Sequence, residues 1–182
     1  MADTPTIKGI FVNSHINALR DLKGEGALRE LKNKFGRSIE FKNLEDVPIR
    51  DEVNLIECIL DLVLGEKIPS ERRSFEAGRL HFKDFTATAL GKIIFSLPAL
   101  KSNFKFMMMR ANNIAGHVFR GVVFESNDTG PNQVEIIMNH NDYPIDHFRG
   151  LFSEWMAFAG YNGEVKAEEI GPGRYKYSAK WK

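Results

Sequence analysis

The sequence feature that most constrains the fold is a change of hydrophobic period near residue 115. Before that point, apolar residues recur at every third or fourth position, which is typical of one buried face of an α-helix. After it, apolar and polar residues alternate, as in a β-strand with one buried face. Helices followed by strands predict an α+β fold, in which a helical N-terminal half packs on a small antiparallel sheet. We expect a single domain, with a helical part over residues 8–113 and a ββαββ part over residues 117–182.

The helical part contains several stretches with a helical pattern. The first carries Phe11, His15, Leu19 and Leu22 on one face. Another, over about residues 50–64, confines its polar residues to one narrow stripe, so we expect it to be mostly enclosed. A third follows Pro69, and its core-facing stripe consists of Phe75, Gly78, Phe82, Phe85, Ala89 and Ile93. Because Gly78 and Ala89 are small, a neighbouring element could approach closely there.

The second part of the chain predicts two hairpins with a helix between them. The first hairpin begins at His117 and turns at residues 127–132, where turn-forming residues cluster. A helix begins after Pro144, which suits the first turn of a helix. The second hairpin turns at residues 171–173, and its last strand places Tyr175, Tyr177, Ala179 and Trp181 on one face.

Charge and cysteine content exclude several classes of protein. Basic and acidic residues number 25 and 24, so no overall field attracts the chain to nucleic acid. Charged residues interrupt every apolar stretch before the ~18 to 20 residues that a membrane helix needs. The single Cys58 forms no internal disulfide and fits a reducing compartment. With a short polar start in place of a signal sequence, we expect a cytoplasmic protein that binds no nucleic acid and does not span a membrane.

No catalytic motif is recognisable. The glycine pairs lack the context of a phosphate-binding loop, and no nucleophile-elbow motif occurs. Cys58 lies in a largely apolar helix, where a thiol would stay protonated. We therefore predict that the protein is not an enzyme and uses no cofactor. A deep pocket with a strongly shifted titratable group would instead favour an enzyme.

His140 and His147, with Asp142 and Asp146 between them, are the most evident candidates for a metal site. Metal motifs usually pair histidines at helical spacing or with cysteines at short fixed spacing, whereas a turn separates these two. We therefore predict no metal at these residues. Asp142 or Tyr143 is expected to serve the N-terminus of the following helix.

The aromatic composition indicates a site for an apolar ligand. Fourteen Phe residues, against four Tyr and two Trp, exceed what one face of a four-stranded sheet needs. The Met107–Met109 run either fills the core or lines an adaptable pocket or interface. The Arg110–Asn113 segment, at an expected helix-to-strand junction, either forms a cap and turn or supplies the polar rim of a ligand cleft. The candidate ligand-binding residues are Phe82, Phe85, Met107, Met108, Arg110, Asn112 and Asn113.

Several short motifs, taken together, resemble one bacterial family. They are Phe75-Glu76-Ala77-Gly78-Arg79, Gly91-Lys92, Arg110-Ala111-Asn112-Asn113, Tyr143-Pro144 up to Gly150, and the Tyr-x-Tyr-x-x-x-Trp pattern of residues 175–181. Their order and spacing are similar to those of an uncharacterised domain family expanded as paralogues in myxobacterial genomes. That family distantly resembles the heme-nitric-oxide-binding sensor domains, and also the four-vinyl-reductase and trafficking-complex domains.

The resemblance implies ligand binding or subunit assembly, but two departures count against heme. Heme sensors supply an axial His from the helical segment just before the first hairpin, and the nearest equivalent stretch, Leu97 to Phe104, contains none. They also carry a Tyr-x-Ser-x-Arg clamp for the heme carboxylates, which is absent from residues 105–125. We therefore expect no bound heme.

Two functions remain open at this point. The first is a non-enzymatic sensory or regulatory module that holds a small apolar ligand in a cleft between the helices and the sheet and signals to a partner protein. The second is a protein-interaction or assembly module that acts as a homodimer without any ligand, in which an exposed apolar helix face would form the interface.

Overall fold

The computed structural model describes residues 4–65, 68–96 and 103–182, and it confirms the α+β class. Its helices are Gly9–Lys23 (α1), Glu25–Phe35 (α2), Ile49–Leu64 (α3), Arg73–Ala87 (α4), Ala89–Ser96 (α5), Phe104–Met108 (α7), Ala111–Val118 (α8) and Ile145–Phe158 (α9), with a 3₁₀ turn at Ser70–Arg72. Its strands are Thr6–Lys8 (β1), Asp46–Pro48 (β2), Phe119–Arg120 (β3), Val123–Gly130 (β4), Gln133–Asn139 (β5), Gly163–Gly171 (β6) and Arg174–Trp181 (β7). None of the helices in these ranges is long and apolar enough to cross a membrane.

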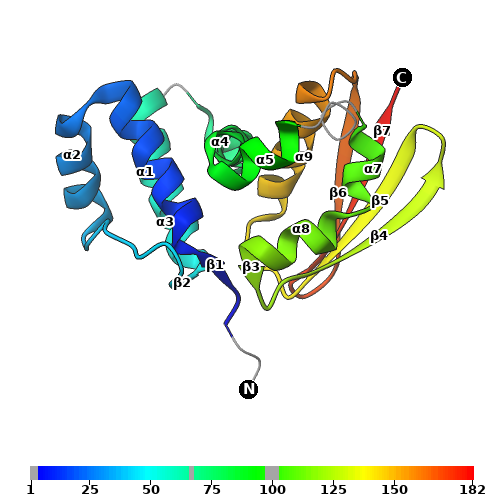
Figure 1. Ribbon diagram of the computed structural model, residues 1–182, viewed down its shortest axis with the longest axis horizontal. Helices are drawn as coiled ribbons and strands as arrows, with labels where there is room; N and C mark the ends of the chain where they lie inside the picture. Colours follow the sequence, from blue (N-terminus) through cyan, green and yellow to red (C-terminus); the bar gives the residue numbers. More distant parts are fainter. Residues whose placement is uncertain (1–3, 66–67, 97–102) are drawn as a thin grey trace.

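The ββαββ unit forms the antiparallel sheet that the sequence predicts, and its four strands lie in the order β4-β5-β7-β6. Helices α7, α8 and α9 pack against this sheet (Figure 1). Alternate side chains of the two central strands are buried on the packed face: Val134, Ile136, Met138, Tyr177, Ala179 and Trp181. The period of two in the sequence therefore reflects one buried and one more exposed face.

A second, three-stranded sheet in the order β2-β1-β3 was not predicted. The sequence suggests a strand from His117 onward, but α8 continues through Val118 and only then does β3 begin. In this sheet Ile7 pairs with Phe119, and Val118 is buried with the N-terminal helices. The prediction fails here because Ala111, Ala115 and Val118 bury one face at helical spacing, and tertiary burial overrides the short alternating pattern.

The Arg110–Asn113 segment joins two helices and is not the predicted helix-to-strand junction. The carbonyl of Arg110 accepts hydrogen bonds from the backbone N–H groups of Asn113 and Ile114, which begins α8. The long helical region after Pro69 is likewise divided, because the Thr88 hydroxyl accepts a hydrogen bond from the Gly91 N–H and starts α5. Two residues of the predicted apolar stripes, Leu22 near the end of α1 and Ile93 in α5, are 65% and 68% exposed.

Helix α4 lies between the N-terminal helices and α9, and two glycines bring it into backbone contact with α9 (Figure 1). A Cβ atom at Gly78 would lie 1.7 Å from the carbonyl oxygen of His147, and one at Gly150 would lie 2.0 Å from that of Phe75. Any side chain at these positions would push the helices apart. This confirms the predicted close approach at Gly78 and brings two histidines of α4 and α9 together.

Candidate functional site

A cluster of six polar side chains is buried where α1, α3, α4 and α9 meet. None of the six residues is more than 6% exposed, although polar residues of these types are seldom buried without partners. We call them the polar cluster: His15 of α1, Glu52 of α3, His81 and Asp84 of α4, Tyr143 just before α9, and His147 of α9.

His15 lies between the two carboxylates of the polar cluster. Its Nδ1 atom is 2.6 Å from Oδ2 of Asp84, and its Nε2 atom is 3.1 Å from Oε1 of Glu52. The other oxygen of Glu52, Oε2, accepts a hydrogen bond from the hydroxyl of Tyr143. Both oxygens of Glu52 and both nitrogens of His15 therefore have partners inside the protein.

The other two imidazoles form the second half of the polar cluster. His81 Nδ1 is 3.0 Å from His147 Nε2, so the N–H of one of these rings donates a hydrogen bond to the nitrogen of the other. His81 Nε2 lies 3.8 Å from Oε1 of Glu52, which is longer than a hydrogen bond.

Within the polar cluster, the pKa values of His15 and Glu52 are shifted in opposite directions. Burial alone would lower the pKa of His15, but hydrogen bonds with Asp84 and Glu52 outweigh burial and raise the pKa to about 9. Burial alone would raise the pKa of Glu52, but the neighbouring imidazoles and the Tyr143 hydroxyl lower it to about 2. At neutral pH, His15 is therefore protonated and Glu52 is ionised.

The other two imidazoles of the polar cluster and the hydroxyl of Tyr143 are neutral. Burial lowers the pKa of His81 to about 4 and holds the pKa of His147 well below its ordinary value. Burial also raises the pKa of the Tyr143 hydroxyl, which therefore stays protonated and donates to Glu52.

The sequence contained a signal for this cluster that our predictions did not use. His15 falls on the apolar stripe of the first helix, and Glu52 lies three and four residues before the buried Leu55 and Ile56. A polar residue on a buried helix face needs a partner, so each position indicated a buried contact. Nothing in the sequence showed that the partners were one another.

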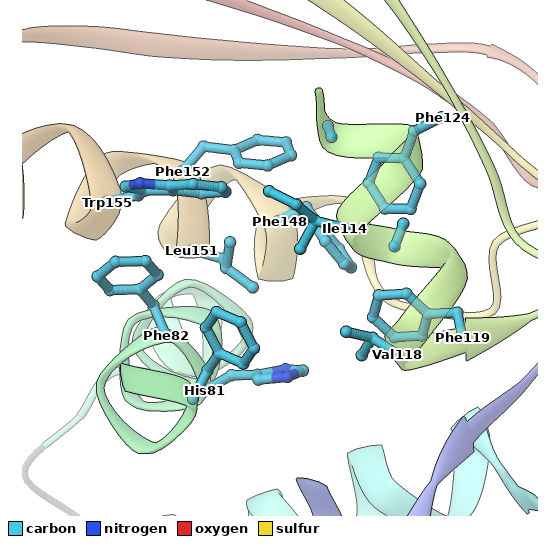
Figure 2. A pocket seen from close by; sticks show the side chains of 13 residues that line it. His81, Phe82, Ile114, Val118, Phe119, Phe124, Phe148, Leu151, Phe152 and Trp155 are labelled. Atoms are coloured by element: carbon cyan, nitrogen blue, oxygen red, sulfur yellow. The ribbon is translucent and has the colours of Figure 1, made fainter. Parts of the chain in front are cut away.

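Beside the polar cluster, an apolar cavity of about 60 Å³ lies between α4, α8 and α9 (Figure 2). His81 borders both the polar cluster and the cavity. The other wall residues are all apolar: Phe82, Phe85, Ala111, Ile114, Ala115, Val118, Phe119, Phe124, Phe148, Leu151, Phe152 and Trp155. Figure 2 shows how α4 and α9 supply most of the aromatic rings and how α8 closes the opposite side.

The structure separates the predicted ligand-binding residues into three groups. Phe82 and Phe85 lie on the wall of the cavity. A different, surface hollow along α7 and α8 is lined by Met107, Arg110 and Asn113 together with other residues. Met108 is buried in the core that faces the sheet, and the side-chain oxygen of Asn112 accepts a hydrogen bond from the N–H of Phe124.

The two histidines considered for a metal site, His140 and His147, lie in different environments. His140 is exposed, with a backbone φ of 57°, whereas His147 is buried in the polar cluster. The expected role of Asp142 or Tyr143 at the N-terminus of α9 is wrong. Pro144 occupies the position before the helix, with no side-chain cap, and Tyr143 instead points its hydroxyl at Glu52.

The arrangement of helices and sheet is that of the H-NOX domains. A mutant of the T. Tengcongensis H-NOX is 18% identical, with a TM-score of 0.61, over 96% of this chain and 97% of that chain. An unliganded Fe(II) H-NOX mutant from K. algicida is 12% identical, with a TM-score of 0.64, over 96% of each chain. An oxygen-binding H-NOX domain related to soluble guanylate cyclases, in its oxygen complex, is 17% identical, with a TM-score of 0.64, over 96% and 95%. At such identities, the likeness establishes the fold.

Within this fold, the chain belongs to the family described as a protein of unknown function (DUF2378), which matches residues 2–182. No curated protein matches it. The predicted resemblance to an uncharacterised family, and beyond it to the heme-nitric-oxide-binding sensor domains, is confirmed at the level of family and fold.

Proposed function

We propose that this protein is a non-enzymatic sensory or regulatory module that binds a small apolar molecule in the cavity between α4, α8 and α9. The observation that carries the proposal is the cavity itself, whose wall is apolar at every residue except His81. A preformed space with apolar walls is suited to an apolar ligand, because water finds few hydrogen-bond partners there. The fold supports the same class of function, since a neighbour of this fold is an oxygen-binding domain related to soluble guanylate cyclases.

The size of the cavity limits the ligand. An engineered apolar cavity of about 150 Å³ holds a benzene molecule. The cavity here, at about 60 Å³, accepts a molecule smaller than benzene. The ligand that fits is therefore a diatomic gas or another apolar molecule of a few heavy atoms.

Heme, which the fold neighbours imply, does not fit the residues of this cavity. A porphyrin has four five-membered rings and is far larger than benzene, whereas aromatic side chains fill the space around this cavity. The helix directly before the hairpin is α8, and it presents only apolar residues to the cavity, while its His117 is exposed. The stretch first compared with the axial-ligand segment, Leu97 to Phe104, lies outside the described residues at positions 97–102.

The cavity has one feature of an enzyme site, the strongly shifted pKa of His81, yet its geometry disfavours catalysis. Both ring nitrogens of His81 lie next to protein groups, Nδ1 beside His147 and Nε2 toward Glu52. Both nitrogens are therefore directed at other members of the polar cluster. Cys58 offers no alternative nucleophile, because burial raises the pKa of its thiol.

Xenon provides a direct test of the proposal, because this apolar atom enters dry protein cavities. We expect a saturable xenon complex of one site per chain, measured by the ¹²⁹Xe chemical shift and by changes in methyl resonances around the cavity. Replacing Ala115 on the cavity wall by Leu should abolish saturation, because the added side chain fills the space. Ile114→Phe provides a second filling variant, at a half-buried wall position where a larger side chain is easier to accommodate.

The matched control is Ala157→Leu, which adds the same side chain at an exposed position of α9. This variant should bind xenon as the unmodified protein does. A folded protein that shows only linear, unsaturated xenon shifts would contradict the proposal, and so would saturation that survives both filling variants.

A further inference from the structure

The polar cluster contains three donor atoms that converge from three helices. Within the described residues, His15, Glu52 and His81 offer one ligand atom each, and these atoms all lie within 4.8 Å of one another. Oε1 of Glu52 is 3.1 Å from Nε2 of His15 and 3.8 Å from Nε2 of His81. Nitrogen and oxygen ligands bind zinc at about 2.0 to 2.2 Å, so two such ligands of a tetrahedral ion lie about 3.3 to 3.6 Å apart. The observed separations bracket that value.

Each of the three donor side chains is oriented by a hydrogen bond with a further member of the polar cluster. Metal-binding histidines almost always direct their second ring nitrogen to another protein group, which fixes the tautomer and the orientation of the ring. Here Nδ1 of His15 faces Asp84 at 2.6 Å, and Nδ1 of His81 faces His147 at 3.0 Å. With both Nδ1 atoms acting as donors, each Nε2 atom is left as the metal-binding atom.

The carboxylate donor is supported in the same way. One oxygen of Glu52, Oε2, is occupied by the hydroxyl of Tyr143, so the other oxygen, Oε1, is directed at the two imidazoles. The arrangement resembles a metal centre in which both the ligands and their supports are in place.

The acidic side chains around His15 add further oxygen atoms to the polar cluster. Glu52 and Asp84 flank the imidazole of His15 on its two nitrogens, and all three side chains are almost completely buried. A divalent ion that binds Nε2 of His15 takes the place of the proton on that nitrogen, and the displaced proton leaves to solvent.

We propose that His15, Glu52 and His81 bind a divalent first-row transition metal ion, of the class that zinc and ferrous iron represent. Two imidazole nitrogens and one carboxylate oxygen form a ligand set used for both of these ions. The proposal does not rest on the apolar ligand, because none of the donor atoms needs the cavity. It differs from the site that the sequence rejected at His140 and His147, since only His147 takes part here, as a support for His81.

Cobalt(II) is the probe, because a buried Co²⁺ with nitrogen and oxygen ligands has visible absorption bands. The chain has five histidines, and two of them, His117 and His140, are exposed. Replacing both by Ala leaves only the three histidines of the polar cluster and removes the exposed imidazoles as surface ligands. Because the polar cluster is buried, Co²⁺ is added both to the folded, chelator-treated protein and during refolding from urea. We expect one Co²⁺ per chain in this background, and its displacement by Zn²⁺.

Three further variants in this background separate metal binding from a purely structural cluster. Glu52→Gln and His81→Ala each remove a ligand, so the visible bands should be lost. Tyr143→Phe removes only the hydroxyl that supports Glu52, and it should weaken Co²⁺ binding about 10-fold to 100-fold. Circular dichroism of the metal-free variants establishes whether each is folded. If Glu52→Gln or His81→Ala does not fold, Tyr143→Phe still tests the site, because it keeps the aromatic ring and loses only the hydroxyl.

The outcome is decisive in either direction. Stoichiometric Co²⁺ binding in the His117→Ala/His140→Ala background that falls in folded Tyr143→Phe supports the metal site. The site is overturned if the refolded background protein binds no Co²⁺, or if folded Glu52→Gln binds Co²⁺ as tightly as its parent. If the unmodified protein shows no saturable xenon binding but the background protein binds Co²⁺, the proposed function is rejected and the metal site is supported.

Discussion

Deleting residues 174–182 is expected to abolish folding of the protein. These residues form β7, which lies inside the four-stranded sheet and pairs with both β5 and β6. Its removal would leave β6 without a partner in this sheet and would uncover the packed face. Tyr177 and Trp181 are 1% and 6% exposed, and the loss of a large buried aromatic side chain costs about 3 to 5 kcal/mol. Two such losses approach the ~5 to 15 kcal/mol of stability that a whole domain has.

The measurement is thermal unfolding followed by far-ultraviolet circular dichroism on the truncated and full-length chains. The truncated chain should show no cooperative transition. Lys180→Ala is the matched control, since it alters an exposed side chain on the same strand and should change stability by no more than about 0.5 kcal/mol. A truncated chain that melts as the full-length protein does would show that β7 is not an internal strand.

The second large effect is expected from Phe82→Ala. Phe82 is 2% exposed, and its ring stacks on Trp155 with centroids 5.6 Å apart and contacts Phe95 edge-on at 5.8 Å. Replacing a buried Phe by Ala costs about 3 to 5 kcal/mol, because apolar contacts are lost and a cavity remains. The site already borders the apolar cavity, so the new space adds to it.

Urea unfolding provides the free energy of unfolding for this comparison, and the matched control is Ile93→Ala. The sequence pattern placed Ile93 and Phe82 on one buried stripe, but the structure leaves Ile93 68% exposed. Ile93→Ala should therefore change stability by less than about 0.5 kcal/mol. Equal effects of the two variants would favour the sequence pattern over the structure, and a cost below about 1 kcal/mol for Phe82→Ala would mean that the ring does not support the core.

The ββαββ unit was predictable because its patterns are local. Alternation in β5 and β7, and spacing of three and four in α9, each arise within one element that has one buried face. Helix α8 was not predictable in the same way. It has eight residues, too few for its helical spacing to outweigh the alternating pattern that begins at His117.

The polar cluster lay beyond sequence reasoning for a different reason. Its contacts join residues that are far apart in the chain, such as His15 with Asp84 and Glu52 with Tyr143. No fixed spacing links them, because α1, α3, α4 and α9 must first pack before the six side chains meet. The sequence did suggest a close contact at Gly78, and this contact is where α4 and α9 approach each other.

The chain has the fold of H-NOX domains, and we propose that its cavity takes a much smaller molecule than heme. Titration of the purified protein with hemin, followed by Soret absorption, tests it most directly. We expect no sharp Soret band and no saturation at one hemin per chain, with the same weak response in His81→Ala and in His117→Ala. A tight complex of one hemin per chain that is lost in either histidine variant would contradict the claim.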